Sequence, residues 1–401
     1  MGNTSRAVGA GVAAAVLASL ALAAPVRADS GDTAAAPDTG AACAPALRVL
    51  KSLPGPDGGN PWLHTDQVNG IGPLGLSVGV SHDRPAYWLG TAVHAVPLPA
   101  GAAGGSVEAV NRLGLMVGTL TGPGGRKAFS YRPGAKAVTL LPGGQYATAV
   151  NDRGHVVGRR HDASTGASTG LEWSGPALRR ELPVPPGFRL DEVTGINNAG
   201  QITGHGSGPT GDDDEPYDMN PGLLWSADTT AAPTLLQPVG GNYEYYRPQA
   251  IDESGRIVGH HWYTRAMQET PLLWTAPYTE PSYVPPPAGS TSGTFEDISP
   301  RTGVSVGAAT TYDPPEDTVV RAQYRSGGGP MRVLPGLTPT GYSAAYAVGD
   351  DDRVGGVALD AAHVAHPVVW TCAGRQAYEP VAPARRPGGS PVGPAGPAKA
   401  P

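Results

Sequence analysis

The chain has 401 residues, of which 28 are Lys or Arg and 34 are Asp or Glu, for a formal net charge of −6. This mild acidity excludes the broad basic surface that attracts nucleic acid or an anionic membrane. Gly (58 residues) and Pro (43 residues) separate short apolar runs along most of the chain, a pattern that predicts an all-β fold.

The N-terminal end has the pattern of a secretory signal. An apolar run over residues 7–24 follows a single basic side chain, and small residues lead to a cleavage point before Asp29. We therefore predict that residues 1–28 form a signal peptide and that the protein is secreted and extracellular. Residues 29–42 have little to bury and are predicted to be a disordered linker. No later run is long enough to span a bilayer.

A short segment recurs seven times after the linker. It consists of a small apolar pair, Asn or a substitute, two or three variable residues, Gly, three residues and Gly, and its clearest copies are residues 109–118 and 149–158. We assign the Asn position of the seven copies to Asn69, Asn111, Asn151, Asn197, Asp252, Pro300 and Gly349. Asn or Asp can bond its own backbone two residues further on, and Gly accepts the positive φ of a tight hairpin. The segment is therefore interpreted as a turn and not as a catalytic motif.

Each copy belongs to a longer unit with four short apolar strands. An aromatic residue closes the third strand of every unit, at Trp88, Tyr131, Trp173, Trp225, Trp274, Tyr324 and Trp370. A large side chain at an equivalent place in every unit indicates packing between neighbouring sheets. Four strands in about 40–50 residues match the blade of a β-propeller. The sequence predicts an all-β, seven-bladed β-propeller of four-stranded blades over residues 43–381, followed by a disordered tail over residues 382–401.

The hairpin and the later apolar-aromatic strand together resemble the HAF repeats of bacterial extracellular proteins. HAF repeats are named for His-Ala-Phe, and the nearest match here is Lys127-Ala128-Phe129. Other units read Gly-Leu-Glu-Trp (170–173), Gly-Leu-Leu-Trp (222–225) and Pro-Leu-Leu-Trp (271–274). The resemblance covers about residues 45–372. It implies a secreted bacterial repeat protein, and it brings no activity and no catalytic residues.

The two ends of the repeat region predict how the ring closes. Residues 46–55 resemble the fourth strand of a unit, whereas the segment after Trp370 is a poorer match, so the N-terminal strand is predicted to complete the last blade. Cys43 and Cys372 would then be neighbours in one turn, and in an oxidising compartment we expect them to form a disulfide. In the alternative, residues 375–381 supply the fourth strand and Cys43 reaches across from an outer extension.

Candidate ligand residues lie in the loops after the last Gly of the repeat, where loop lengths vary, and in the segments before its Asn position. By analogy with other propellers, these loops share one face of the ring. The candidates there are His82, Asp83, His161, Asp162, His205, His260, His261, Trp262 and Tyr245. A metal or acid–base role requires several of them to converge, and we favour repeat ancestry with solvated loop ends as their explanation. Aromatic side chains that would stack on sugars are Trp62, Trp262, Tyr243, Tyr245 and Tyr246.

An acidic loop carries Asp212, Asp214 and Asp218, whose carboxylates are the ligand type that Ca²⁺ prefers. The sixth position counted from Asp212 is Tyr217 and not the Gly of an EF-hand loop. We therefore favour a solvated acidic loop and expect no cofactor.

The sequence contains no phosphate-binding loop and no His-Glu-x-x-His element. The preferred hypothesis is a monomeric, non-catalytic binding or scaffold propeller whose partner is an extracellular glycan, a cell-envelope polymer or a protein. One alternative is a secreted glycan hydrolase or lyase with His and acidic residues at the channel mouth. The other is a structural protein-interaction module.

Overall fold

The computed structural model describes residues 43–55, 66–209, 220–227, 230–236, 244–263, 268–311 and 318–380. The predicted signal peptide, linker and C-terminal tail lie outside these ranges, as do Trp62, Tyr243, Asp212, Asp214 and Asp218. Among the described residues, no helix has the length and hydropathy needed to cross a membrane.

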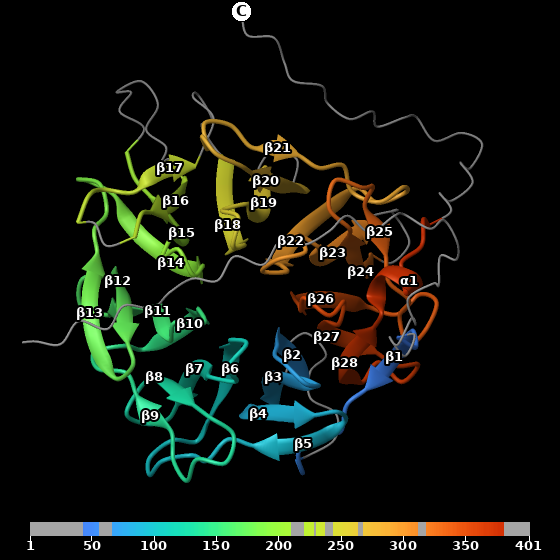
Figure 1. Ribbon diagram of the computed structural model, residues 1–401, viewed down its shortest axis with the longest axis horizontal. Helices are drawn as coiled ribbons and strands as arrows, with labels where there is room; N and C mark the ends of the chain where they lie inside the picture. Colours follow the sequence, from blue (N-terminus) through green and yellow to red (C-terminus); the bar gives the residue numbers. More distant parts are fainter. Residues whose placement is uncertain are drawn as a thin grey trace, which may run out of the picture. The chain divides into compact units, whose positions relative to one another are not determined.

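The described residues form seven antiparallel sheets of four strands, arranged as the blades of a ring (Figure 1). Blade 1 consists of β2 (Asp66–Ile71), β3 (Leu76–Ser81), β4 (Arg84–Leu89) and β5 (Ala92–Ala95). Blade 2 consists of β6 (Gly104–Val110), β7 (Met116–Thr121), β8 (Lys127–Tyr131) and β9 (Thr139–Leu140). Blade 3 consists of β10 (Tyr146–Val150), β11 (His155–Asp162), β12 (Ala167–Ser174) and β13 (Ala177–Leu182). Blade 4 consists of β14 (Arg189–Ile196), β15 (Ile202–Ser207), β16 (Gly222–Trp225) and β17 (Thr234–Leu236).

The remaining blades follow the same order. Blade 5 consists of β18 (Glu244–Ile251), β19 (Ile257–Tyr263), β20 (Gln268–Trp274) and β21 (Ser282–Tyr283). Blade 6 consists of β22 (Ser292–Ile298), β23 (Ser305–Thr311), β24 (Val319–Arg325) and β25 (Arg332–Val333). Blade 7 consists of β26 (Ser343–Val348), β27 (Val354–Leu359), β28 (Ala365–Thr371) and the N-terminal β1 (Ala46–Val49). The first strand of each blade faces the centre of the ring (Figure 1), and the predicted fold class is confirmed.

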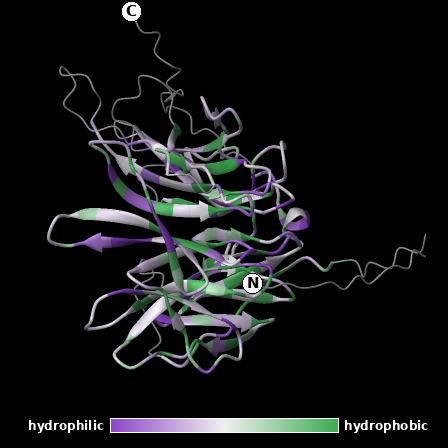
Figure 2. Cartoon of the chain, turned by 60° about the vertical axis from the view of Figure 1, so that its left-hand side comes forward, coloured by the Kyte–Doolittle hydropathy of each residue, from purple (hydrophilic) through white to green (hydrophobic). Residues whose placement is uncertain are grey.

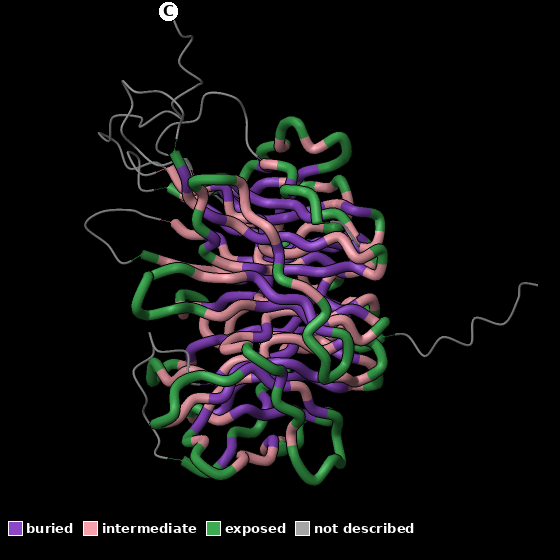
Figure 3. The backbone as a smooth tube through the Cα atoms, turned by 90° about the vertical axis from the view of Figure 1, so that its left-hand side faces the viewer, coloured by how far each residue is buried: buried purple, intermediate pink, exposed green. Residues whose placement is uncertain are grey.

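Apolar side chains fill the space between neighbouring blades. In the contact between blades 1 and 2, for example, Val78 packs with Met116 and Phe129, and all three are fully buried. Figure 3 shows buried residues along the strands and exposed residues at the turns that join them. In Figure 2, hydrophobic stretches accordingly lie within the strands. Burying these stretches between sheets is the main stabilising term of such a ring.

The seven aromatic residues at the ends of the third strands are all buried, as the sequence analysis predicts. Their exposed fractions are 5% or less, at Trp88, Tyr131, Trp173, Trp225, Trp274, Tyr324 and Trp370. Several of the indoles also donate a hydrogen bond to the end of the preceding blade, for example from Trp173 Nε1 to the carbonyl of Pro142 at 3.0 Å. These residues therefore join neighbouring blades.

The N-terminal strand closes the ring. β1 pairs with β28 in antiparallel register, with Leu47 opposite Trp370. Trp88 of blade 1 donates to the carbonyl of Lys51 at 2.7 Å, which is the same link that joins other neighbouring blades. The chain after β28 forms α1 (Ala373–Gln376), and Tyr378 then bridges to Val333 of blade 6, so this segment does not complete blade 7.

The predicted disulfide is present. Cys43 and Cys372 are bonded, with a Cα–Cα distance of 6.0 Å and a sequence separation of 329 residues. The Thr371 hydroxyl also donates to the carbonyl of Ala44 at 2.8 Å. The disulfide and β1 together join the two ends of the ring.

The Asn-x-x-Gly segment forms the turn between the first two strands of a blade. The N–H of Asn111 donates to the carbonyl of Leu115 at 3.0 Å, and the Asn111 Oδ1 atom accepts the N–H of Leu115 at 2.9 Å. In blade 1 the equivalent turn bond starts at Gly72, which donates to Leu76 at 2.9 Å. In blade 6 it starts at Ser299. The assignment of this position to Asn69 and Pro300 was therefore wrong.

A β-bulge interrupts the first strand of every blade. In each pair of first and second strands the register shifts around one residue, and these bulge residues are Asn69, Glu108, Thr148, Thr194, Gln249, Glu296 and Tyr346. The last Gly of each repeat lies opposite the bulge. A Cβ atom at Gly158, for example, would collide with the main-chain carbonyl oxygen of Tyr146. The bulge therefore explains why the repeat needs Gly at this position.

Candidate functional site

The two ends of the ring differ in their connections. In an antiparallel four-stranded blade, the first and third turns lie at one end, which we call the turn end. The loop after the second strand and the connection to the next blade lie at the other end, which we call the loop end. The Asn-x-x-Gly turns belong to the turn end, and the candidate ligand residues that the structure describes lie toward the loop end.

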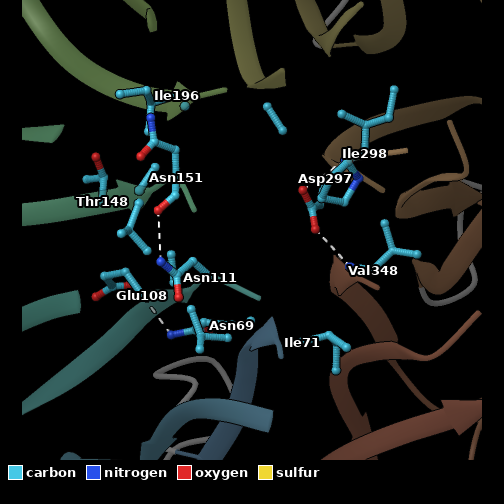
Figure 4. A pocket seen from close by; sticks show the side chains of 18 of the residues that line it. Asn69, Ile71, Glu108, Asn111, Thr148, Asn151, Ile196, Asp297, Ile298 and Val348 are labelled. Atoms are coloured by element: carbon cyan, nitrogen blue, oxygen red, sulfur yellow. Dashed lines mark hydrogen bonds between the residues drawn. The ribbon is translucent and has the colours of Figure 1, made fainter. Parts of the chain in front are cut away.

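A channel with a cavity of about 770 Å³ runs along the centre of the ring. Its wall is formed by the first strands of all seven blades, and it extends to the turns at the turn end, where Asp152 and Glu253 line it. Figure 4 shows side chains from facing blades directed into this space. All seven bulge residues line the channel.

Three bulge residues have a structural role. Each donates to a carbonyl in the next blade: Asn69 Nδ2 to Val107 at 3.0 Å, Thr148 Oγ1 to Val193 at 2.6 Å, and Thr194 Oγ1 to Pro248 at 2.8 Å. In each case the acceptor is the residue just before the bulge of the next blade. These bonds satisfy polar groups at the channel edge of the first strands.

Carboxyl groups occupy other places on the channel wall. Glu108 accepts hydrogen bonds from Ser106 Oγ and from Asn69 Nδ2, the latter at 3.3 Å. Asp297 accepts the main-chain N–H of Val348 at 2.8 Å, and Figure 4 shows this bond. Glu192 and Glu296 also line the channel.

Burial disfavours the ionised form of these acids. Burial, with a smaller contribution from the nearby carboxylate of Glu269, raises the pKa of Glu296 to about 7. Burial also raises the pKa of Asp297 to about 7, against the hydrogen bonds that it accepts. The pKa of Glu108 is raised for the same reason, with a contribution from Glu192. In the channel, the negative charge of one carboxylate therefore makes ionisation of a neighbouring carboxyl group less favourable.

The histidine candidates of the sequence analysis are spread over four blades. His82 and Asp83 lie at the β3–β4 turn, His161 and Asp162 end β11, and His205 lies on β15. His161 is exposed, and Asp162 caps its own turn by accepting the N–H of Ser164 at 2.9 Å. None of these residues lines the channel cavity.

The other four candidates lie together on the β18–β19 hairpin of blade 5. Tyr245 is directly opposite Trp262, and both are partly exposed. On the same face, Arg247 is opposite His260, and the Arg247 guanidinium carbon lies 5.6 Å from the centre of the Tyr245 ring. Glu269 of β20 is opposite Trp262. We call these five residues the blade-5 face.

His260 is the buried end of the blade-5 face. It is 5% exposed, its Nε2 atom is 3.9 Å from Glu269 Oε1, and its Nδ1 atom has no hydrogen-bond partner among the described residues. Burial, helped by the positive charge of Arg247, lowers its pKa to about 3, so the imidazole is neutral at physiological pH. His261 points to the opposite face, where it stacks on Tyr246 with 5.0 Å between ring centres.

Three segments fit the spacing Gly-x-Ser-x-Gly, at residues 75–79, 166–170 and 303–307. Ser77 and Ser305 lie in β3 and β23, and each is 2% exposed or less. A nucleophile elbow needs an exposed serine on a sharp turn between a strand and a helix. Ser77 and Ser305 are therefore part of the packing between blades. Ser168 lies within the β11–β12 strand pair, opposite His161, and not on a turn between a strand and a helix.

The channel wall is the feature that the sequence analysis missed. The sequence does contain a signal for the channel wall. Each bulge residue lies three positions before the turn residue of its blade and interrupts a run of small or apolar residues, as Glu108 does before Asn111. The bulge itself appears only in the pairing of the strands. Without it, these polar residues look like part of the turn.

Comparisons with known proteins identify the fold and no family. No family model and no curated protein sequence matches the chain. The β-propeller domain of the Trilobed protease from Pyrococcus furiosus, which has an open velcro topology, superposes with a TM-score of 0.52 at 8% identity, over 76% of this chain and 94% of that chain. A chain of the mitotic checkpoint complex gives a TM-score of 0.46 at 10% identity, over 86% of this chain and 98% of that chain. By its sheets, the chain is a seven-bladed β-propeller whose N-terminal strand closes the last blade, and the first of these likenesses agrees with the β-propeller fold.

Proposed function

We propose that this protein is an extracellular, non-catalytic binding module that holds a glycan or a cell-envelope polymer at its loop end. The observation that carries this proposal is the cross-strand pair Tyr245–Trp262 on blade 5. Two aromatic side chains at directly opposite positions of a hairpin can offer a flat apolar surface with little side-chain entropy to lose. The apolar faces of sugar rings fit such a surface.

The polar groups of the blade-5 face add directionality to this surface. Arg247 can donate to ring or hydroxyl oxygens, and Glu269 can accept from sugar hydroxyls. Both lie on the same face of the sheet as the aromatic pair. An apolar platform with a few fixed polar groups is the usual composition of a small-molecule site.

The disulfide and the apolar segment over residues 7–24 support the proposed extracellular compartment. A disulfide between Cys43 and Cys372 persists in an oxidising compartment and is rare in the cytosol. The apolar segment over residues 7–24 has the composition of a secretory signal. Both features support secretion, and the HAF-like repeats fit a bacterial extracellular protein.

The test is binding of the mature protein to a glycan array and to insoluble cell-wall polysaccharides. We expect the native protein to be retained by at least one polymer, and Trp262→Ala and Tyr245→Ala to lose about tenfold in affinity. Tyr378→Ala is the matched control, because Tyr378 is 41% exposed and lies on blade 6. Equal binding by all variants, or no binding to any polymer, would rule out the blade-5 face as a glycan site.

The same polymers separate binding from catalysis. A hydrolase or lyase would release soluble sugars from the retained polymer over time, and the release would depend on Glu269. We expect retention without release. Sugar release by the native protein that Glu269→Gln abolishes would replace the binding proposal with the enzymatic one.

A further inference from the structure

The residues that line the central channel carry an excess of negative charge that the packing of the blades does not explain. We propose that it is a binding site for a small linear cation with two or more amino groups, of the polyamine class. This site is separate from the blade-5 face, and it rests on the composition and geometry of the channel wall.

The charge of the lining residues is strongly one-sided. The acidic residues that line the cavity are Glu108, Asp152, Glu192, Glu253, Glu296, Asp297, Asp350 and Asp351, whereas the basic ones are Arg112 and Arg301. Both arginines already face an acid of the same wall. Arg112 Nε is 2.7 Å from Asp152 Oδ2, and Arg301 Nε is 4.0 Å from Asp350 Oδ2.

Other cations near the channel do not line it. Arg159 and Arg126 lie over the ring of Tyr146, at 4.1 and 5.4 Å from its centre, and Arg247 lies beside Tyr245. Arg353 pairs with Asp351 at 2.7 Å. Apart from Arg112 and Arg301, no Lys or Arg is among the residues that line the cavity. The inner carboxylates Glu108, Glu192 and Asp297 therefore have no lining cation of their own, and Glu296 has only the nearby charge of Arg247.

The repeat does not dictate these acids. Glu108 and Glu296 occupy the bulge position, where Asn69, Thr148 and Thr194 donate hydrogen bonds that tie the blades together. Asp297 stands where the other six blades have a small residue: Gly70, Ala109, Ala149, Gly195, Ala250 and Ala347. A carboxylate at either position is a departure from the architecture and calls for a functional reason.

Two polar groups of the wall also lack a hydrogen-bond partner among the described residues. Thr119 lines the cavity and is 6% exposed, and no hydrogen bond joins its hydroxyl to another described residue. The Oε1 atom of Gln67, another lining residue, is buried and has no partner in the described part of the chain. An acceptor and a hydroxyl left in this way match a ligand that brings N–H donors.

The placement of the acids selects the shape of the cation. Glu108 and Asp297 lie on opposite walls (Figure 4). The charge of Glu192 raises the pKa of Glu108, and the charge of Glu296 raises the pKa of Asp297. The acids therefore form two groups, one around Glu108 and one around Asp297. A metal ion needs ligands that converge at one point, and no described group of three or more His, Cys, Asp or Glu side chains is placed to hold one. A linear cation with separated amino groups can instead contact both walls.

The experiment is calorimetric titration of the mature protein with spermidine at pH 8 and low salt. The test variant is Glu192→Gln/Glu296→Gln, which removes one carboxylate from each group. Glu181→Gln is the control, because Glu181 is an exposed acid on β13 outside the channel. We expect the native protein and the control to bind equally, and the double variant to bind about 100-fold more weakly, at about tenfold for each lost charged hydrogen bond.

Two further arms make the proposal specific. Butylamine, which has one amino group, is expected to bind much more weakly than spermidine, and Mg²⁺ at an equal concentration is expected not to displace spermidine. Lowering the pH from 8 to 6 protonates the acids and should weaken binding. The proposal is overturned if spermidine does not bind the native protein, if the double variant binds as well as the control, or if butylamine or Mg²⁺ competes equally.

Discussion

The side-chain amide of Asn111 donates a hydrogen bond to the main-chain carbonyl of Asn151 in the next blade, over 2.8 Å. Asn151 does the same to Asn197 at 3.0 Å, and Asn197 to Asp252 at 3.1 Å. At the seam between blades 7 and 1, the guanidinium of Arg353 donates to the carbonyl of Gly72. The turn residues thus link the blades around the turn end.

Asn151→Ala tests this linkage. The substitution leaves the N–H of His155 without its side-chain acceptor and removes one of the two donors to the carbonyl of Asn197, which keeps the N–H of Gly200. We expect a loss of about 2–3 kcal/mol in the free energy of unfolding, because buried polar groups left unpaired are costly. Chemical denaturation followed by fluorescence measures it.

Arg153→Ala is the control for Asn151→Ala, because Arg153 is exposed in the same turn. It should change the free energy of unfolding by less than about 0.5 kcal/mol. If Asn151→Ala were as mild as this control, the bonds between turns would contribute nothing to stability.

Part of this architecture follows from the sequence, because a periodic pattern reports packing that every blade needs. The aromatic residues, such as Trp173, and the Asn turns recur at equivalent places, so they predict the blades and their number. The phase of the repeats at the two ends predicts the closure and the disulfide. These inferences depend on spacing along the chain.

The channel wall could not be found in this way. A bulge adds one residue to a strand, and its side chain then points to the channel, but only the pairing with the next strand reveals the shift. Asn69 was assigned to the turn for this reason, although it is the bulge residue of blade 1 and the turn begins at Gly72. The blade-5 face is a contrasting case, because Tyr245 and Trp262 were singled out from the sequence and only their pairing came from the structure.

Gly158→Ala tests the bulge itself. A Cβ atom there would overlap the carbonyl oxygen of Tyr146, so the first two strands of blade 3 would have to separate. We expect a loss of at least about 2 kcal/mol in stability, as for other overpacked positions. Gly124→Ala is the matched control, since a Cβ atom at Gly124 meets nothing within 4 Å. Similar melting temperatures for the two variants would mean that the strands adjust freely.

Removing the disulfide should loosen the seam. The Cys43–Cys372 bond closes a loop of 329 residues, and the chain-entropy relation gives a stabilisation of about 4–6 kcal/mol for loops of this size. We expect Cys43→Ser/Cys372→Ser to melt well below the native protein, and β1 to become accessible to protease first. The reduced native protein should behave like the variant. A melting temperature that reduction leaves unchanged would assign the closure to the β1–β28 pairing alone.

The channel acids predict a stability that depends on pH. The folded-state pKa of Glu296 is about 7, above the value of 4.5 for the free side chain, so between about pH 4.5 and pH 7 the folded protein binds more protons than the unfolded chain. The contribution of this group to stability therefore falls as the pH rises through that window. Glu296→Gln removes the cost of ionising a buried acid. We expect it to raise the stability by on the order of 1 kcal/mol at pH 8 and to leave it nearly unchanged at pH 4.

Thermal melts of Glu296→Gln and the native protein at the two pH values measure this difference. Glu181→Gln serves again as the control, because Glu181 is exposed and outside the channel, so its effect should not vary in this way with pH. Asp297 is also a buried acid with a raised pKa, so Asp297→Asn should raise the stability at pH 8 as well. We expect the gain to be smaller, because the N–H of Val348 loses a charged acceptor. A stabilisation by Glu296→Gln that is equal at pH 4 and pH 8 would mean that Glu296 titrates as an ordinary carboxyl group, and that the channel does not hold its acids in competition for protons.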